Sequence, residues 1–264
     1  MVGRTTFLAL VSLLSLASLG DIVSLGRSDA PDSVVPLSPL TQSNDWTAQH
    51  YIQSGLVHMW DARWNAGWGT NDPNAAIWKD LVGDMDLSRG HSSYTWGEGY
   101  ALLTRLYSGN NGLGWYNTGH ISGDTVFCEV VFQLLGNPEN RNDGLVSFSY
   151  KQNTSSKTSQ LGVKNGILQY GDAGGGVDVS DTYNGVHSAS FDIYYNTGPR
   201  YFDGARAIPS AVVYTMGSNS GAHIGSFWYG CNARIYCVRL YRKTLSTWEV
   251  EWNNTVDRMR FGIQ

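Results

Sequence analysis

The chain has 264 residues, of which 15% are charged, and a formal net charge of −4. This mildly acidic balance, with no basic cluster, argues against a general nucleic-acid binder. The sequence also holds 31 glycines and 10 tryptophans, and 42% of its residues are hydrophobic. A chain of this size can bury a large hydrophobic core without disulfide bonds. One all-β sandwich domain would account for most of its length.

The N-terminal segment, residues 1–26, is mostly apolar. Arg4 precedes an apolar stretch at 7–19, and small residues follow that stretch. This order is typical of a secretory signal peptide, and the stretch is shorter than the about 20 apolar residues that span a bilayer. The same segment would act as an anchor if it is retained in a larger assembly, and retention is what we expect. Cleavage would leave a mature chain that starts near Asp21.

The next segment, residues 27–53, has a different composition. It contains three of the chain's seven prolines and no sustained periodicity. Such a stretch predicts an extended linker or arm. Two interpretations stay open for it, a tether and an arm that docks on a partner.

Residues 54–264 have the pattern of a β-sandwich. Short alternating or apolar runs lie between glycine-rich turns, and about twelve to fourteen strands are expected. In the run TVFCEVVFQLL at 125–135, for example, Cys128, Val130 and Phe132 fall on one face of a strand.

The C-terminal region combines an alternating strand with a helix. Within Ala233–Tyr241, the residues Ile235, Cys237 and Leu240 interleave with polar positions, which predicts a strand with one buried face. Ser246 and Glu249 have the spacing of a capping box, so we expect a helix to begin there. The apolar residues of this helix form one stripe that should pack on the sandwich: Trp248, Trp252, Val256 and Met259.

Several aromatic residues lie in glycine- and asparagine-rich loops rather than in strands. The loop at 63–75 and the loop at 107–123 are the longest of these, and a short aromatic turn follows at 227–230. Aromatic rings stack on the CH faces of sugars, while Asn and Asp bond sugar hydroxyls. We therefore predict a carbohydrate-binding site made of loop aromatics: Trp64, Trp68, Trp115, Tyr116, Trp228 and Tyr229.

The alternative for the tryptophans at 63–75 is that one or both fold inward over the edge of the sandwich. The remaining tryptophans that we weighed are assigned to the core or to docking of the helix: Trp60, Trp78, Trp248 and Trp252.

The cysteines, Cys128, Cys231 and Cys237, predict neither a disulfide framework nor a metal site. Cys128 lies inside an apolar strand and should pack as a small hydrophobe. On one strand, Cys231 and Cys237 would lie about 20 Å apart, which is too far for a bridge. Asp61 and Asp80 are acidic candidates for a site. An aspartate before a glycine-bearing turn usually bonds backbone N–H groups, so we expect structural roles for both.

Three stretches carry a family resemblance. They are GLVHMWD at 55–61, WKDLVG at 78–83 and RIYCVRLYRKTLSTWEVEWN at 234–253. Together they resemble laminin-G-like, concanavalin A-like jelly-roll domains of the lectin and glucanase type. The tail at 253–261 further resembles a variant found in phage and gut Bacteroidales proteins. The resemblance implies a two-sheet antiparallel jelly-roll sandwich over 54–264, with a short C-terminal helix and an N-terminal arm.

The resemblance raises the question of catalysis, because bacterial β-glucanases share this fold. Their chemistry needs two carboxylates that flank the scissile bond, and in those relatives the carboxylates sit on one strand as Glu-x-Asp-x-Glu or a close variant. No strand of this sequence has that spacing, since Glu129 is followed two positions later by Val131. The histidines are scattered and form no Ser/His/Asp grouping. We therefore expect a protein that is not an enzyme.

Calcium is the one metal that the resemblance suggests, because many laminin-G-like domains bind it at the rim of the sandwich. Loop carboxylates that could serve are Asp72, Asp172, Asp178 and Asp181. They form no organised ligand pattern, so we expect no cofactor.

The leading hypothesis is a non-catalytic structural protein of a phage virion, in a fibre, an appendage or a capsid decoration. Residues 1–50 would dock on other virion proteins in a homo-oligomer, and the jelly roll would bind host-surface glycans. The alternative is an exported bacterial carbohydrate-binding protein, secreted or held at the cell surface, from which residues 1–20 are removed. A third hypothesis is a decoration protein without a ligand, whose loop tryptophans are covered.

Overall fold

The computed structural model describes most of one folded unit, which begins at Trp46. The residues described are 46–90, 94–104, 115–117, 121, 127–136, 143–152, 155–164, 167–170, 176–178, 185–193, 198–207, 221–225 and 232–263. The expected N-terminal segment and most of the expected arm lie outside these residues. The unit starts earlier than residue 54, because Trp46–Ile52 packs against the C-terminal helix.

The first sheet is antiparallel and is built around the strand nearest the C-terminus. Its order is β14-β13-β12-β7-β16-β5-β4, and β1 also pairs with β16. Strand β5 pairs with the first part of β16, whereas β1 pairs with its second part from Cys237 to Tyr241. The strands are β1 (Leu56–Asp61), β4 (Thr95–Gly97), β5 (Tyr100–Leu103), β7 (Phe127–Leu134), β12 (Val186–Asp192), β13 (Arg200–Phe202), β14 (Ala205–Ala207) and β16 (Ala233–Tyr241).

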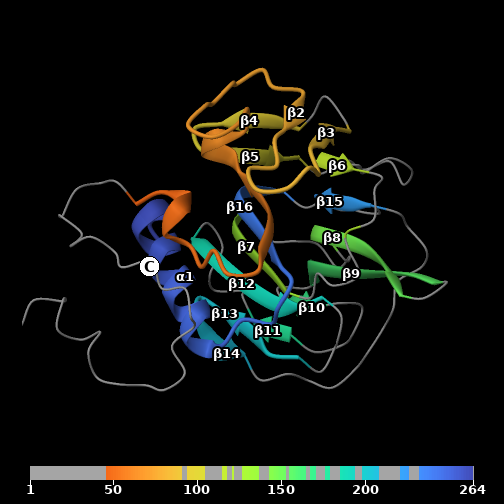
Figure 1. The fold of residues 1–264 in the computed structure, drawn as a ribbon, viewed down its shortest axis with the longest axis vertical. Helices are drawn as coiled ribbons and strands as arrows, with labels where there is room; N and C mark the ends of the chain where they lie inside the picture. The colour runs from red at the N-terminus through yellow and green to blue at the C-terminus, as the bar shows by residue number, and fades with distance from the viewer. Residues whose placement is uncertain are drawn as a thin grey trace, which may run out of the picture. The chain divides into compact units, whose positions relative to one another are not determined.

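The second sheet is also antiparallel, in the order β11-β10-β9-β8-β15-β6-β3-β2. Its strands are β2 (Ile77–Trp78), β3 (Leu87–Arg89), β6 (Trp115–Asn117), β8 (Asp143–Gln152), β9 (Ser155–Lys164), β10 (Ile167–Tyr170), β11 (Gly176–Asp178) and β15 (Ala222–Ile224). Short 3-10 turns η2 (Ala48–His50) and η3 (Ala62–Trp64) flank β1, and helix α1 (Thr247–Phe261) closes the unit (Figure 1). The predicted all-β sandwich with a C-terminal helix is confirmed.

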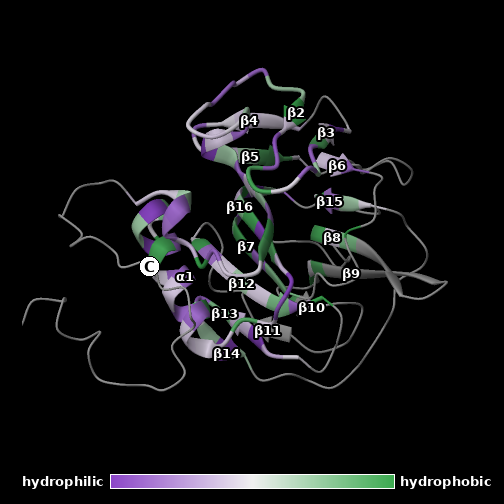
Figure 2. Cartoon of the chain, viewed as in Figure 1, coloured by the Kyte–Doolittle hydropathy of each residue, from purple (hydrophilic) through white to green (hydrophobic). Residues whose placement is uncertain are grey.

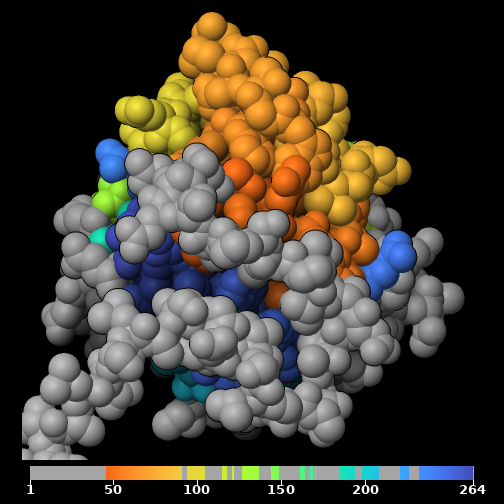
Figure 3. Space-filling view, turned by 60° about the vertical axis from the view of Figure 1, so that its left-hand side comes forward, coloured from red at the N-terminus to blue at the C-terminus, as the bar shows by residue number. Residues whose placement is uncertain are grey.

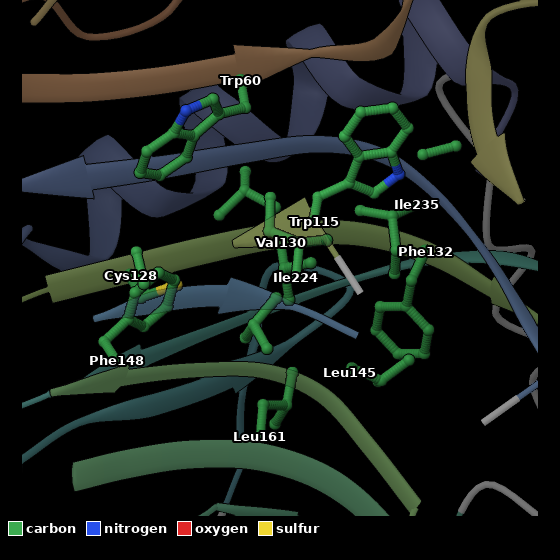
Figure 4. Packing of buried hydrophobic residues seen from close by; sticks show 14 of the residues in the cluster. Trp60, Trp115, Cys128, Val130, Phe132, Leu145, Phe148, Leu161, Ile224 and Ile235 are labelled. Atoms are coloured by element: carbon green, nitrogen blue, oxygen red, sulfur yellow. The ribbon is translucent and has the colours of Figure 1, made fainter. Parts of the chain in front are cut away.

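The main core lies between the two sheets (Figure 4). From the first sheet, Cys128, Val130 and Phe132 point into it, as their alternation predicted. From the second, Phe148 and Leu161 meet them, and all five side chains are fully buried. Burying a side chain such as Phe or Leu stabilises the fold by about 1.5–3 kcal/mol, so the contacts in this layer contribute substantially to stability.

The first sheet is buried on both faces at its centre. All eight residues of β7 are buried, because α1 lies against the face that points away from the second sheet (Figure 1). A second apolar cluster forms there around Phe127, Val131, Val250 and Val256. The molecule therefore has three layers where α1 covers the sandwich.

Strand β16 departs from the strict alternation expected of it. Its pairing with β7 shifts register between Ile235 and Cys237, which is the signature of a β-bulge. Residues Ile235, Val238 and Leu240 face the core between the sheets, but Cys237 joins the cluster under α1. The prediction that Cys237 shares a face with Ile235 is therefore wrong, because the extra residue reverses the side-chain order.

Helix α1 begins where its capping box predicted. Ser246 is the N-cap; its hydroxyl accepts a hydrogen bond from the Glu249 backbone, and the Glu249 carboxylate accepts one from the Ser246 backbone. The predicted apolar stripe is correct for Val256 and the partly buried Trp252, but wrong for the other two residues. Trp248 and Met259 are 42% and 59% exposed, and most of the buried residues of the helix are polar. Purple and pale colours predominate along α1 in Figure 2. Its buried residues are Glu249, Val250, Asn253, Asn254, Val256, Asp257 and Arg260.

A buried network of charges explains why this helix face is polar. Arg239 on β16 donates two hydrogen bonds to Asp257 on α1, at 2.7 and 2.8 Å, and a third from Nε to Glu129 on β7 at 3.0 Å. Arg260 donates to Asp61 at 2.5 Å and to the Tyr51 hydroxyl at 2.9 Å. Buried charges are tolerated only when paired and hydrogen-bonded in this way.

Two of the three cysteines are buried in this fold. Cys128 and Cys237 are both free thiols, and Cys231 lies outside the described residues. Among the described residues, no helix has the length and apolar character needed to cross a membrane.

Candidate functional site

The loop that follows β1 is ordered by its own hydrogen bonds. Asp61 ends the strand and caps η3, since its Oδ1 accepts a hydrogen bond from the Arg63 backbone at 2.9 Å. The chain then turns through Gly67 and Gly69, whose φ angles of 124° and 69° suit glycine and few other residues. Thr70 closes the turn by donating its N–H to the carbonyl of Gly67 at 2.9 Å.

A buried amide fixes the loop from the inside. Asn65 is fully buried, donates to the carbonyl of Asp72 and accepts from the N–H of Asp72, both at 2.8 Å. The side chain of Asn71 donates to the carbonyl of Ala62 at 3.1 Å. These bonds span the loop, so it keeps its shape without a ligand.

The two tryptophans of this loop lie side by side. The ring centroids of Trp64 and Trp68 are 5.3 Å apart and tilted by 51°. Trp64 is half-buried, whereas Trp68 is 46% exposed. The indole N–H of Trp68 donates to the carbonyl of Leu81 at 2.5 Å, which holds the ring in place. Residues of this stretch form the orange apex in Figure 3.

Polar side chains follow the exposed ring in the sequence. Thr70, Asn71, Asp72 and Asn74 are all exposed in the same loop. Their hydroxyl, amide and carboxylate groups supply donors and acceptors beside a fixed apolar ring. This combination can bind a ligand that has both CH faces and hydroxyl groups.

The structure places the other predicted site residues elsewhere. Trp115 is fully buried and packs in the core at 4.3 Å from Trp96, centroid to centroid. The expectation that Trp115 is exposed in a loop is wrong, because β6 pairs with both β3 and β15 and draws the ring into the sandwich. Tyr116, the next residue, is half-buried on the opposite face of β6, stacked on His223 with 6.1 Å between centroids. Trp228 and Tyr229 lie outside the described residues.

Sequence reasoning missed a row of arginine and aromatic side chains, which we call the Arg-Tyr strip. Its members are Arg234, Tyr100, Tyr236, Phe261 and Arg63. A signal for it was present in Arg-x-Tyr on β16, where both residues fall on the outward face before the bulge. The other three come from β5, the end of α1 and η3, which only the fold brings together.

The strip carries positive charge around a phenol. Burial raises the pKa of Tyr236, although the hydrogen bonding and charge of Arg234, and the charge of Arg63, act in the opposite direction. Burial and the neighbouring Arg260 lower the pKa of Arg63. A guanidinium stays protonated in proteins, so both arginines remain cations.

The calcium candidates form no metal centre in the part of the chain that is described. No group of three or more His, Cys, Asp or Glu residues gathers there. Asp72 uses its Oδ1 to accept a hydrogen bond from the backbone of Asn74 at 2.8 Å. Asp172 and Asp181 lie outside the described residues, and Asp178 is placed on β11 by its backbone.

Comparisons with known proteins show the fold but not a family. A scan against models of protein families finds no match, and a search of curated proteins finds none. The fold is similar to that of a Trypanosoma rangeli sialidase in complex with sialic acid, at 13% identity and a TM-score of 0.52, over 78% of this chain and 34% of the sialidase chain. A mutant of that sialidase displaying trans-sialidase activity gives 0.53 at 12% identity, over 78% of this chain and 33% of the other.

A third structure is less similar. The binding domain of botulinum neurotoxin serotype D has a TM-score of 0.49 at 12% identity, over 76% of this chain and 50% of that chain, which is too low to support an argument. The comparisons therefore support a β-sandwich, while membership of the laminin-G-like or concanavalin A-like families is not shown by any family match. The chain spans about a third of the length of the sialidases.

The expectation that this protein is not an enzyme is contradicted by the same comparison. It depended on the missing carboxylate spacing of β-glucanases, which tests one mechanism only. Structures that share the fold include sialidases, one of them described as a covalent intermediate with difluorosialic acid. A single absent motif therefore does not exclude catalysis. At this identity the likeness concerns the fold, and it assigns no reaction to the chain.

Proposed function

We propose that this β-sandwich binds carbohydrate through the loop at residues 63–75. The observation that carries the proposal is the exposure of Trp68. This ring is 46% exposed although its indole N–H is bonded to Leu81. The ring is therefore held at the surface, where its face and edge are open to a ligand.

The surroundings of Trp68 favour a sugar over a purely apolar ligand. The ring offers only its face and edge, because its N–H is already engaged. The exposed amide, hydroxyl and carboxylate groups of Asn71, Thr70 and Asp72 suit hydroxyl groups. Because hydrogen bonds already fix the loop, binding loses little conformational entropy.

One structural comparison supports carbohydrate as the class of ligand. The sialidase with the same fold was determined with sialic acid bound, so the fold occurs in a protein that handles a sugar. That likeness covers a third of the sialidase and contributes only the class of ligand to the proposal.

The test compares two variants with similar loss of exposed indole surface. Trp68→Ala should weaken binding to an array of bacterial surface glycans by about tenfold or more, because a stacking ring is removed. Trp248→Ala is the matched control, since Trp248 is 42% exposed on α1 and should leave binding unchanged. Equal binding by the parent and the Trp68→Ala variant would show that the site is placed wrongly.

We also propose the biological setting suggested by the tail at 253–261, which resembles phage and gut Bacteroidales proteins. In that setting the chain is a virion component, attached to other virion proteins through residues 1–50 as a homo-oligomer, and its ligand is a host-surface glycan. Mass spectrometry of N-terminal peptides from the natural source is the test. Peptides from residues 1–19 in purified particles support it. A chain that starts near Asp21 in a cell envelope would favour the exported bacterial protein instead.

A further inference from the structure

The Arg-Tyr strip is a continuous surface beside the end of α1. The Arg234 guanidinium carbon lies 4.5 Å from the Tyr100 ring centre, and Tyr100 lies 5.9 Å from Tyr236. Tyr236 lies 5.4 Å from Phe261, whose ring is 5.0 Å from the Arg63 guanidinium carbon. Two cations thus terminate a row of three aromatic rings.

The strip leads directly to the proposed sugar-binding loop. Arg63 precedes Trp64 in η3, and the Arg260 guanidinium carbon lies 5.8 Å from the Trp64 ring centre. Trp64 in turn packs against Trp68. A ligand with more than one sugar unit that rests on Trp68 can therefore reach the strip.

Neither terminal arginine of the strip has a carboxylate partner among the residues that the structure describes. Arg63 donates to the backbone carbonyl of Arg260. Arg234 donates to the side-chain oxygen of Gln133 at 2.9 Å. By contrast, Arg239 and Arg260 are both paired with buried acids.

The fork of a guanidinium matches a carboxylate or a sulfate, and its bonds to such groups are about twice as strong as neutral ones. Tyr100 and Tyr236 flank the fork with half-buried ring faces. The exposed Glu98 lies in the turn before Tyr100 and pairs with neither arginine in the described structure.

From this arrangement we propose that the carbohydrate is anionic, and that Arg63 and Arg234 bind its carboxylate or sulfate groups while the tyrosine rings contact its sugar rings. This inference rests on the proposed function and narrows it to acidic glycans. The two anionic groups share one recognition chemistry, and the experiment separates them.

The experiment measures binding of the whole chain to polygalacturonate, dextran sulfate and neutral dextran. The parent protein should bind at least one of the charged polymers about tenfold more tightly than neutral dextran, and added salt should weaken that binding. A preference for polygalacturonate identifies carboxylate, and a preference for dextran sulfate identifies sulfate. Arg63→Gln and Arg234→Gln should each lower this binding about tenfold.

Arg206→Gln is the matched control for general charge. Arg206 is exposed on β14, and its loss changes the net charge by the same amount. If Arg206→Gln weakens binding as much as Arg63→Gln does, the attraction is non-specific and the inference is overturned. Thermal melting of each variant checks its folding. If Arg234→Gln does not fold, Arg63→Gln alone decides, because its exposed side chain is not needed in the core.

The outcome also separates this inference from the proposal it rests on. Equal affinity of the parent for charged and neutral polymers, lost in Trp68→Ala, would overturn the anionic ligand but keep carbohydrate binding. Failure to bind any polymer or any glycan on the array would overturn both. Tighter binding to duplex DNA than to either charged polysaccharide would also overturn the inference.

Discussion

Asp80 shows how one carboxylate can organise several backbone segments. Its Oδ1 accepts from the N–H groups of Met59 at 3.0 Å, Val82 at 3.1 Å and Gly83 at 3.0 Å. Its Oδ2 accepts from Met85 at 3.1 Å and lies 2.6 Å from His58 Nδ1. The structural role expected for Asp80 is confirmed by these contacts, which tie β1 to the turn that leads to β3.

We expect Asp80→Asn to destabilise the fold by about 2–4 kcal/mol, because an amide replaces a buried acceptor of several N–H groups. Asp84→Asn, in the exposed part of the same turn, is the control and should change little. Urea denaturation of the two variants measures the difference. Similar midpoints for both would mean that the Asp80 bonds contribute no more than an exposed aspartate does.

The same residue predicts a dependence of stability on pH. Burial by itself would raise the pKa of Asp80, but the hydrogen bonds from His58 and the Gly83 backbone outweigh burial and lower the pKa below 3.8. A lowered pKa in the folded state adds stability above pH 3.8 and loses it as the pH falls below that value. Melting temperatures measured downward from pH 5 should therefore fall less steeply for Asp80→Asn than for the parent. Parallel curves would contradict this.

At the scale of elements, α1 is joined to the first sheet by buried ion pairs as well as by apolar contacts. Arg239 reaches Asp257 on the helix and Glu129 on β7. Burial raises the pKa of Glu129, and the charge of Arg239 opposes that effect. Asn253 adds a hydrogen bond to Glu129 at 2.6 Å. The network joins three elements at one point.

Removal of Arg239 should be costly because it leaves buried acids without a partner. We expect Arg239→Met to destabilise the protein by about 3–5 kcal/mol. Arg206→Met on exposed β14 is the control with the same change of charge. The midpoints of denaturant unfolding give the stability of each of the two variants. If Arg239→Met is as stable as the parent, packing rather than pairing holds α1 in place.

The N-cap of α1 should contribute less to the stability of the protein than the Arg239 ion pairs do. Ser246→Ala removes the hydroxyl that accepts from Glu249 at 3.4 Å and should cost about 1 kcal/mol. Thr255→Ala, at an exposed position of the same helix, serves as the control. Denaturant unfolding gives both values. A larger loss in Ser246→Ala than in Arg239→Met would mean that the cap stabilises α1 more than the buried ion pairs do.

Local patterns predicted the elements well, but distant partners decided which faces they bury. The capping box at Ser246 and the alternation at Cys128, Val130 and Phe132 depend on neighbours in sequence, and both are confirmed. The polar face of α1 depends on contacts such as Arg260 with Asp61, which are 199 residues apart, and the bulge in β16 appears in its pairing with the distant strand β7. The sequence of the helix alone does not predict that Arg260 pairs with an aspartate on β1.

The sequence also predicted only part of the candidate site. The composition of the loop at 63–75 pointed to Trp68, whose exposure fits that interpretation. The loop composition around Trp115 is similar, but there it led to a wrong prediction of exposure. The ring of Trp115 is buried because β6 pairs with a strand on each side. The Arg-Tyr strip draws its members from four separate elements, so no single stretch of sequence contains it.

At the scale of the whole molecule, the segment before β1 belongs to the folded unit. Tyr51 is 2% exposed and donates its hydroxyl to Asp257 at 2.6 Å. The Arg239 guanidinium lies 3.8 Å from the centre of the same ring. Ile52 donates its N–H to Asn253 at 2.9 Å. Trp252 donates in return to the carbonyl of His50 at 2.8 Å.

Truncation tests this boundary. A chain that starts at residue 44 keeps the described residues before β1, whereas one that starts at residue 54 loses Tyr51 and its bonds. We expect the second truncation to cost about 3 kcal/mol or more and to lower Tm by about 6–12 °C. Calorimetry measures both. Equal Tm values would place the boundary of the unit at residue 54.

The position of β16 in the first sheet has a consequence for how the protein is made. This strand pairs with β1, β5 and β7, yet it lies at residues 233–241. During synthesis on the ribosome, the earlier strands of this sheet emerge without the partner that joins them. Their apolar faces stay open until the end of the domain leaves the exit tunnel, and long-range pairing of this kind is slow. We therefore expect the complete sheet to form only once β16 is available, and more slowly than a sheet built from consecutive strands.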